Sequence, residues 1–162
     1  MATTVYHGAD GTISVAVESG PSGDVAKAVV DKYSLTPIGR ATGVTLRVTN
    51  DVKPFHELGQ RFATDLRPGN LNVFGTIERA YINGALLRLM LGDAAESRPA
   101  ATFVGPTFNL SLQLRNPAIP DSSASVTVMG VQINEWNYSL PEDDFVMEKV
   151  GFRALWIKTE ET

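Results

Sequence analysis

Strict alternation of hydrophobic and polar residues predicts β-strands over much of this chain. In residues 107–115, phenylalanine and three leucines occupy every second position, and polar residues fill the positions between them. A period of two places one set of side chains on each face of a strand. The same kind of pattern predicts strands over residues 11–18, 44–49, 71–78, 107–115, 124–136 and 145–158.

Two of these strands carry additional information. The alternation in residues 124–136 slips by one position at Met129–Gly130, which predicts a β-bulge. Residues 145–158 are partly apolar on both faces. That pattern predicts a strand that is buried on both sides or covered on one side by another subunit.

Helical periodicity appears in two segments. In Arg79–Leu91, Ile82, Leu86 and Leu89 form one apolar stripe, and the glycine that follows is a typical helix stop. In Asp24–Tyr33, valines and a tyrosine recur every four residues, which favours a short helix. The run of residues 28–30 leaves a strand open as an alternative there.

These elements predict a mainly β fold: a single antiparallel β-sandwich or barrel with one packed helix at about 79–91 and a possible second helix at about 24–33. No internal repeat or interdomain linker is evident, so we expect one domain over residues 1–162. Residues 55–69 are irregular and polar, with interspersed glycine and proline. A loop of that length is more often functional than a plain connector.

Composition narrows the possible classes of function. The chain has 162 residues, a net charge of −4 and no cysteine. An acidic chain argues against a dedicated nucleic-acid binder, and the absence of cysteine excludes disulfides and thiolate metal sites. Neither a leader-like start nor an apolar run long enough to span a bilayer is present, so we expect a protein that is soluble in a cytoplasm, without a membrane partner.

Candidate catalytic and metal-binding residues are few. The two histidines, His7 and His56, lack the spacing to acids that a metal site requires. The residue types of a catalytic triad are present in Ser122, His56 and Asp65. No nucleophile-elbow motif surrounds the serine, so the sequence does not support a triad. Phosphate-binding glycine motifs are also missing. The sequence therefore predicts no enzyme, no metal and no cofactor.

Two stretches resemble the tail tube proteins of bacteriophages. Phe74–Gly92 looks like their strand–helix unit, and Asp143–Ile157 is similar to their last strand. The resemblance covers the chain from Val73 onward and, more loosely, residues 55–69. It implies a β-barrel subunit that forms sixfold rings, which stack into a hollow tube for DNA delivery. The inner tubes of contractile injection systems use a related subunit.

The resemblance also implies partners and a location. The main partner implied is further copies of the chain itself. Sheath, tape measure and baseplate proteins are further partners, and DNA passes through without specific binding. The location implied is the virion tail, assembled in the host cytoplasm. A tail terminator, a baseplate adaptor ring and an injection-system tube are alternatives within this class. A soluble ligand-binding β-barrel is the competing class.

Two groups of residues are candidates for assembly. The loop at 55–69 mixes aromatic and basic side chains, which suggests ring stacking or docking on a neighbouring subunit rather than contact with phosphate. Its candidates are Phe55, His56, Arg61, Phe62 and Arg67. The polar face of the strand at 107–115 is expected to line the lumen or meet a neighbour. Its candidates are Asn109, Ser111, Gln113 and Arg115.

Overall fold

One long strand, β7, belongs to two half-sheets that together form a curled, open half-barrel. We analysed a computed structural model that describes residues 5–100, 103–119 and 121–161. The strands are β1 (Gly11–Ala16), β2 (Ala41–Asn50), β3 (Lys53–Phe55), β4 (Asp65–Arg67), β5 (Leu71–Ala80), β6 (Phe108–Arg115), β7 (Ser123–Ser139), β8 (Met147–Ala154) and β9 (Trp156–Glu161). The helices are α1 (Pro21–Tyr33) and α2 (Ala85–Leu91), with short 3-10 turns η1 (Gly8–Asp10) and η2 (Gly92–Ala95).

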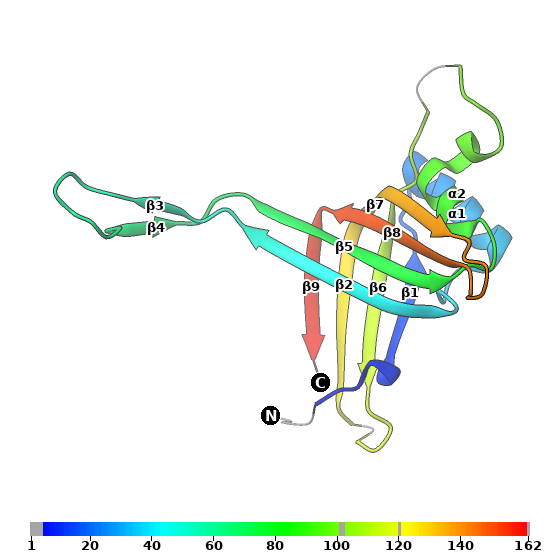
Figure 1. The fold of residues 1–162 in the computed structure, drawn as a ribbon, viewed down its shortest axis with the longest axis horizontal. Coiled ribbons are helices and arrows are strands. Elements are labelled where there is room, and N and C mark those ends of the chain that lie inside the picture. The colour runs from blue at the N-terminus through cyan, green and yellow to red at the C-terminus, as the bar shows by residue number, and fades with distance from the viewer. Residues whose placement is uncertain (1–4, 101–102, 120, 162) are drawn as a thin grey trace.

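All strand pairs are antiparallel. The first half-sheet has the order β1-β6-β7-β9 and uses the N-terminal part of β7. The second half-sheet has the order β7-β8-β5-β2 and uses the C-terminal part of β7. Figure 1 shows the two half-sheets running in different directions, with α1 and α2 packed at one end and the β3–β4 hairpin extending beyond the other. This confirms the predicted mainly β fold with helices packed against it.

The predicted bulge in β7 marks the boundary between the two half-sheets. Phe108 pairs with Val131 but Leu110 pairs with Val128, so β7 carries one extra residue there. Gly130 has a φ of +68°, a conformation that favours glycine. On the other edge of β7, the predicted strand over residues 145–158 is divided into β8 and β9 at Leu155. The two breaks face each other, since the Leu155 N–H donates to the Met129 carbonyl over 3.0 Å.

The core lies between the two half-sheets and beneath the helices. Apolar residues from both half-sheets and both helices form one cluster in which most side chains are almost fully buried. Its members include Ile13, Val15, Val29, Ile77, Leu86, Leu89, Phe108, Leu110, Val128, Val150 and Phe152. Because strand side chains alternate, the opposite face of each half-sheet is left for solvent or for a partner.

The helix predicted from residue 79 begins at Ala85 instead. Arg79 and Ala80 still belong to β5, where they pair with Glu148 and Met147 of β8. Their local pattern is compatible with a helix, but the buried side chain of Arg79 contacts Glu148, 69 residues away in sequence, and this holds the segment in the sheet. The helix predicted at about 24–33 is confirmed as α1, which extends from Pro21 to Tyr33. The strand alternative at 28–30 is therefore wrong.

Candidate assembly surfaces

The irregular segment predicted at 55–69 is a two-stranded arm that projects away from the half-barrel (Figure 1). At its base the Asp51 N–H donates to the Asn70 carbonyl over 3.0 Å. The Gly69 N–H donates to the side chain of Asn50 over 3.1 Å. The chains approach so closely here that a Cβ on Gly69 would lie 2.0 Å from the Asp51 carbonyl oxygen. Gly69 therefore allows β2 and β5 to continue into a narrow arm.

The structure brings the five predicted loop residues together on this arm, and all five are exposed. Phe55 is 58% exposed and Phe62 is 86% exposed. Two leucines on the arm, Leu58 and Leu66, are likewise exposed. Burial of one such side chain is worth about 1.5–3 kcal/mol, so a surface of this kind favours contact with another protein.

The charged residues of the arm are also open to solvent. Arg67 forms an ion pair with Asp65 over 3.1 Å, and both side chains are mostly exposed. Within the described residues, Arg61 and His56 have no ion pair or side-chain hydrogen bond. An exposed pair on a hairpin contributes little to stability. These charges are therefore available for a partner.

The predicted lumen residues Ser111 and Gln113 lie on a polar face of the first half-sheet, opposite the core. Strand register places polar residues in rows across all four strands of this face. One row is Ser14, Ser111, Thr127 and Lys158, and the next is Thr12, Gln113, Ser125 and Glu160. Lys158 and Glu160 pair over 2.8 Å, which holds the pKa of Glu160 below its usual value. Arg115, at the end of β6, is exposed at the rim of the same half-sheet.

Asn109 is a correction to this set, because it is only 9% exposed. Its amide donates to the Glu18 carboxylate over 3.0 Å and its carbonyl accepts the N–H of Gly130 over 3.1 Å. These bonds fix the β7 bulge. The predicted place of Asn109 on an open face is wrong, because the segment after β1 covers this end of the strand.

Sequence reasoning missed a second apolar surface, at the end of the second half-sheet remote from the arm. The end of β5, the end of β7 and the start of β8 meet there, since Ala80 and Ser139 both pair with Met147. We call this surface the end patch. Its large exposed side chains are Tyr81, Ile82, Tyr138, Leu140 and Phe145. The sequence signal was the pair of large apolar residues that flanks the acidic turn 141–144, but only the register adds the two tyrosines.

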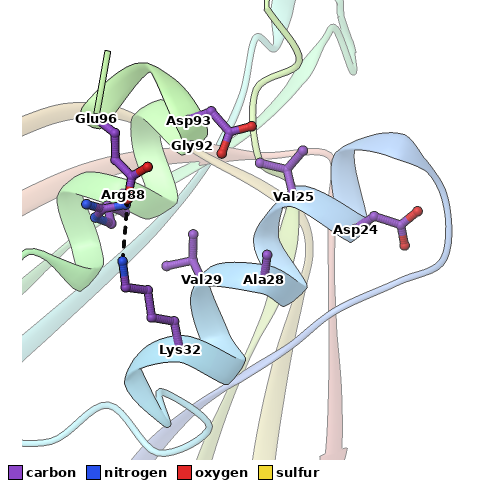
Figure 2. Close-up of a pocket in the computed structure, with 9 residues that line it drawn as sticks. All are labelled: Asp24, Val25, Ala28, Val29, Lys32, Arg88, Gly92, Asp93 and Glu96. Atoms are coloured by element: carbon purple, nitrogen blue, oxygen red, sulfur yellow. Dashed lines mark hydrogen bonds and ion pairs between the residues drawn. The ribbon is translucent and has the colours of Figure 1, made fainter.

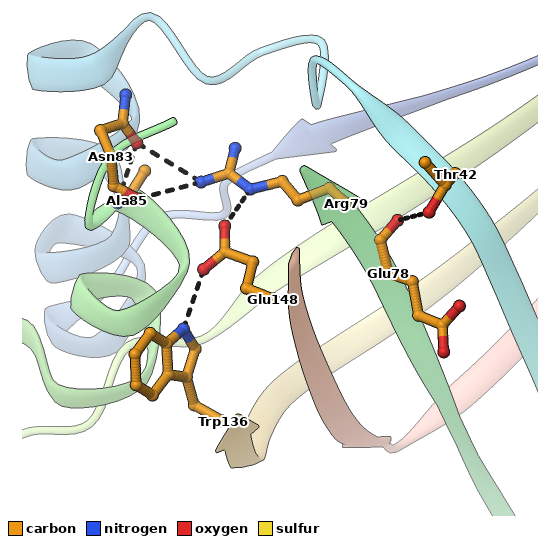
Figure 3. A network of polar contacts seen from close by, with 7 residues as sticks. All are labelled: Thr42, Glu78, Arg79, Asn83, Ala85, Trp136 and Glu148. Atoms are coloured by element: carbon orange, nitrogen blue, oxygen red, sulfur yellow. Dashed lines mark hydrogen bonds and ion pairs between the residues drawn. The ribbon is translucent and has the colours of Figure 1, made fainter. Parts of the chain in front are cut away.

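A buried polar network lies beside this end of the half-sheet (Figure 3). Arg79 and Glu148 are each 1% exposed and form an ion pair. The second carboxylate oxygen of Glu148 accepts the indole N–H of Trp136 over 2.9 Å. The guanidinium of Arg79 also donates to the backbone carbonyl of Asn83 over 3.3 Å. The network ties β5, β7 and β8 to the segment that leads into α2.

A shallow cleft separates α1 from α2 and η2 (Figure 2). Glu96 accepts from Arg88 over 2.5 Å and from Lys32 over 3.4 Å. These cations, Arg88 first, hold the pKa of Glu96 below its usual value, and Glu96 in turn raises the pKa of Arg88. The cluster joins the two helices across solvent. Among the described residues, no group of three or more histidines and acids is placed to hold a metal ion, and no helix is long and apolar enough to cross a membrane.

Sequence comparison and structure comparison give different results. No family model matches the chain, and no curated protein matches its sequence. The fold, by contrast, is found in solved structures across nearly the whole chain. The chain covered by these matches includes the antiparallel half-barrel, both helices and the arm.

Three solved structures illustrate the likeness. A chain of the anti-feeding prophage tube-terminating cap matches with a TM-score of 0.66 and 9% identity, covering 100% of this chain and 95% of that one. A chain from the PVC contractile injection system sheath/tube terminator matches with a TM-score of 0.64 and 13% identity, covering 99% of both. The SPP1 tail tube matches with a TM-score of 0.63 and 12% identity, covering 98% of this chain and 80% of that one.

The chain therefore has the fold of tail tube and tube terminator proteins of phages and contractile injection systems. The resemblance inferred from sequence is confirmed at the level of the fold. These matches are to structural components of tubes, which supports the prediction that the chain is not an enzyme.

Proposed function

We propose that residues 1–162 act as one tail tube subunit that forms hexameric rings, and that the rings stack into a hollow tube for DNA delivery. One observation carries the proposal: the tail tube fold here combines a polar face on one half-sheet with an exposed apolar arm. Both features are unexplained in a free monomer and are useful in a tube. The virion tail, assembled in the host cytoplasm, is the proposed location.

Ring closure is supported by the margins of the first half-sheet. β9 ends this half-sheet, and no described strand pairs with its outer edge. An unpaired edge can add a strand from another chain. At the other margin, backbone hydrogen bonds join β1 to the segment 36–38. The Val15 N–H donates to the Thr36 carbonyl over 2.7 Å, and the Ile38 N–H donates to the Ile13 carbonyl over 3.0 Å. Contact between one margin and the opposite margin of the next copy is head-to-tail, and such contacts close into rings.

The polar face then lines the channel. Ser111, Gln113 and Arg115 lie on it or at its rim, together with small hydroxyl side chains of β1 and β7. In a chain of net charge −4, a lumen of this kind offers phosphates few fixed cations. DNA would pass without being held. In this arrangement the second half-sheet and the helices face outward.

The arm joins rings to one another. Its candidate contacts are Phe55, His56, Arg61, Phe62 and Arg67. A sheath, a tape measure protein and a baseplate are further proposed partners. The sheath is included because PVC injection-system structures with this fold carry a sheath in their names.

A tube terminator ring is the second candidate, because the solved structures with this fold include a sheath/tube terminator and a tube-terminating cap. Electron microscopy of the purified chain separates the two functions. A tube subunit forms long hollow tubes, whereas a terminator forms single rings. Arg61→Glu combined with Arg67→Glu should leave a folded protein that no longer forms tubes. Normal tubes from this variant would contradict the role of the arm.

A further inference from the structure

Two exposed apolar surfaces, the arm and the end patch, adjoin opposite ends of the second half-sheet. The arm continues from the end where Asn50 pairs with Leu71. The end patch surrounds the opposite end, where Ala80 pairs with Met147. Figure 1 shows the arm pointing away from that end, so one copy cannot bring its own arm to its own patch.

Each surface offers large side chains that the fold of a single copy leaves in water. On the arm, Phe62 is 86% exposed and Leu58 is fully exposed. On the end patch, Phe145 is 80% exposed and Leu140 is 69% exposed. The patch is also ordered by ring contacts, since Tyr138 lies 5.4 Å from Tyr81 and 4.8 Å from Trp136 between ring centres. Tilted ring contacts of this kind restrict the side-chain rotamers before a partner arrives, which reduces the entropy lost on binding.

The arm has a slight excess of positive charge, whereas the turn beside the end patch is acidic. The arm between Lys53 and Arg67 bears three cations and two acids, although the chain as a whole is acidic. The turn beside the end patch bears three acids, Glu142, Asp143 and Asp144, all exposed. None of these three forms an ion pair within the described residues. Charges arranged in this way steer a cationic arm onto the patch and oppose contact between two patches.

We infer that the end patch is the docking surface for the arm of a second copy of this chain. The aromatic and leucine side chains of the arm pack on Tyr138, Leu140 and Phe145, and the arm cations face the acidic turn. Because the two surfaces differ, the contact is head-to-tail and each copy uses both. The inference rests on the proposed function and adds the receiving surface to it.

The direct test is disulfide trapping, which is clean because the chain contains no native cysteine. The double variant Phe62→Cys, Phe145→Cys should give a ladder of covalent oligomers after mild oxidation of assembled protein. Either single variant should give no ladder, since one cysteine can link only two copies. A second pair, Leu58→Cys with Leu140→Cys, covers a shift in register. Normal tubes without a ladder from either pair would overturn the inference.

Substitution of the patch tests the same contact without cross-linking. Leu140→Ser combined with Phe145→Ser should reduce pelletable tubes at least tenfold, with an unchanged thermal unfolding profile, because both side chains are already exposed. Val5→Ser is the matched control, since Val5 is 88% exposed and lies outside both surfaces. Tubes at the wild-type level from the patch variant would overturn the inference and leave the proposed function intact. A wild-type protein that stays monomeric would overturn the proposed function itself.

Discussion

Replacing Arg79 with methionine should destabilise the protein by several kilocalories per mole. The side chain is 1% exposed and forms an ion pair with Glu148, which is also 1% exposed. Methionine fills much of the same volume but leaves the carboxylate of Glu148 without its cation. The indole N–H of Trp136 remains as a neutral donor to it over 2.9 Å.

The magnitude follows from the burial of this charge. Removal of one partner from a buried ion pair costs about 3–5 kcal/mol, because the other charge is left desolvated and unpaired. Adding Glu148→Gln removes that charge and keeps an oxygen that can accept the bond from Trp136. The double variant should therefore regain at least half of the loss, although it lacks both charges.

Urea unfolding followed by tryptophan fluorescence measures this effect, since Trp136 is part of the network. For a urea dependence of about 2 kcal/mol per molar, Arg79→Met should lower the midpoint by about 2 M. Arg61→Met is the control, because Arg61 is exposed on the arm and its replacement should change stability by less than about 0.5 kcal/mol. An Arg79→Met variant within about 1 kcal/mol of wild type, or a double variant as unstable as the single one, would refute the reasoning.

Three further predictions concern the arm, the helices and the lumen. Gly69→Ala should abolish tube formation, because a new Cβ would lie 2.0 Å from a backbone oxygen. The control variant Gly105→Ala has open space for its Cβ and should assemble normally, and sedimentation measures the amount of tubes that each variant forms. Arg88→Met should raise the pKa of Glu96 toward its usual value in an NMR titration, since Arg88 is the main cause of the lowered pKa. This pair stabilises the fold above the usual glutamate pKa, and the effect is lost as pH falls through the lowered pKa. Gln113→Lys should make assembled tubes retain DNA at low salt, as a filter-binding assay would show, and an unchanged DNA retention would count against the lumen assignment.

Local periodicity was sufficient for several elements of the fold. The alternation in residues 107–115 predicts β6, and the phase slip at Gly130 predicts the bulge that divides β7 between two half-sheets. Each of these signals depends on side chains within one strand. Both features can therefore be predicted without knowing how the strand pairs with its neighbours.

Long-range contacts decided the features that sequence reasoning missed. The start of α2 depends on Arg79, whose partner Glu148 is 69 residues away. The burial of Asn109 depends on Glu18, 91 residues away. The end patch exists only because three strand ends meet, so its tyrosines could not be grouped with Phe145 from the sequence. By contrast, the sequence predicts a functional loop at 55–69, because glycine, proline, aromatic and basic residues share one continuous segment, whereas the pairing of β3 with β4 into an arm comes from the structure.

The central claim is that this chain polymerises into a tube, and electron microscopy of the purified protein tests it most directly. The account predicts hollow tubes built of stacked sixfold rings. A protein that remains monomeric at high concentration, or that stops at single rings, would contradict it.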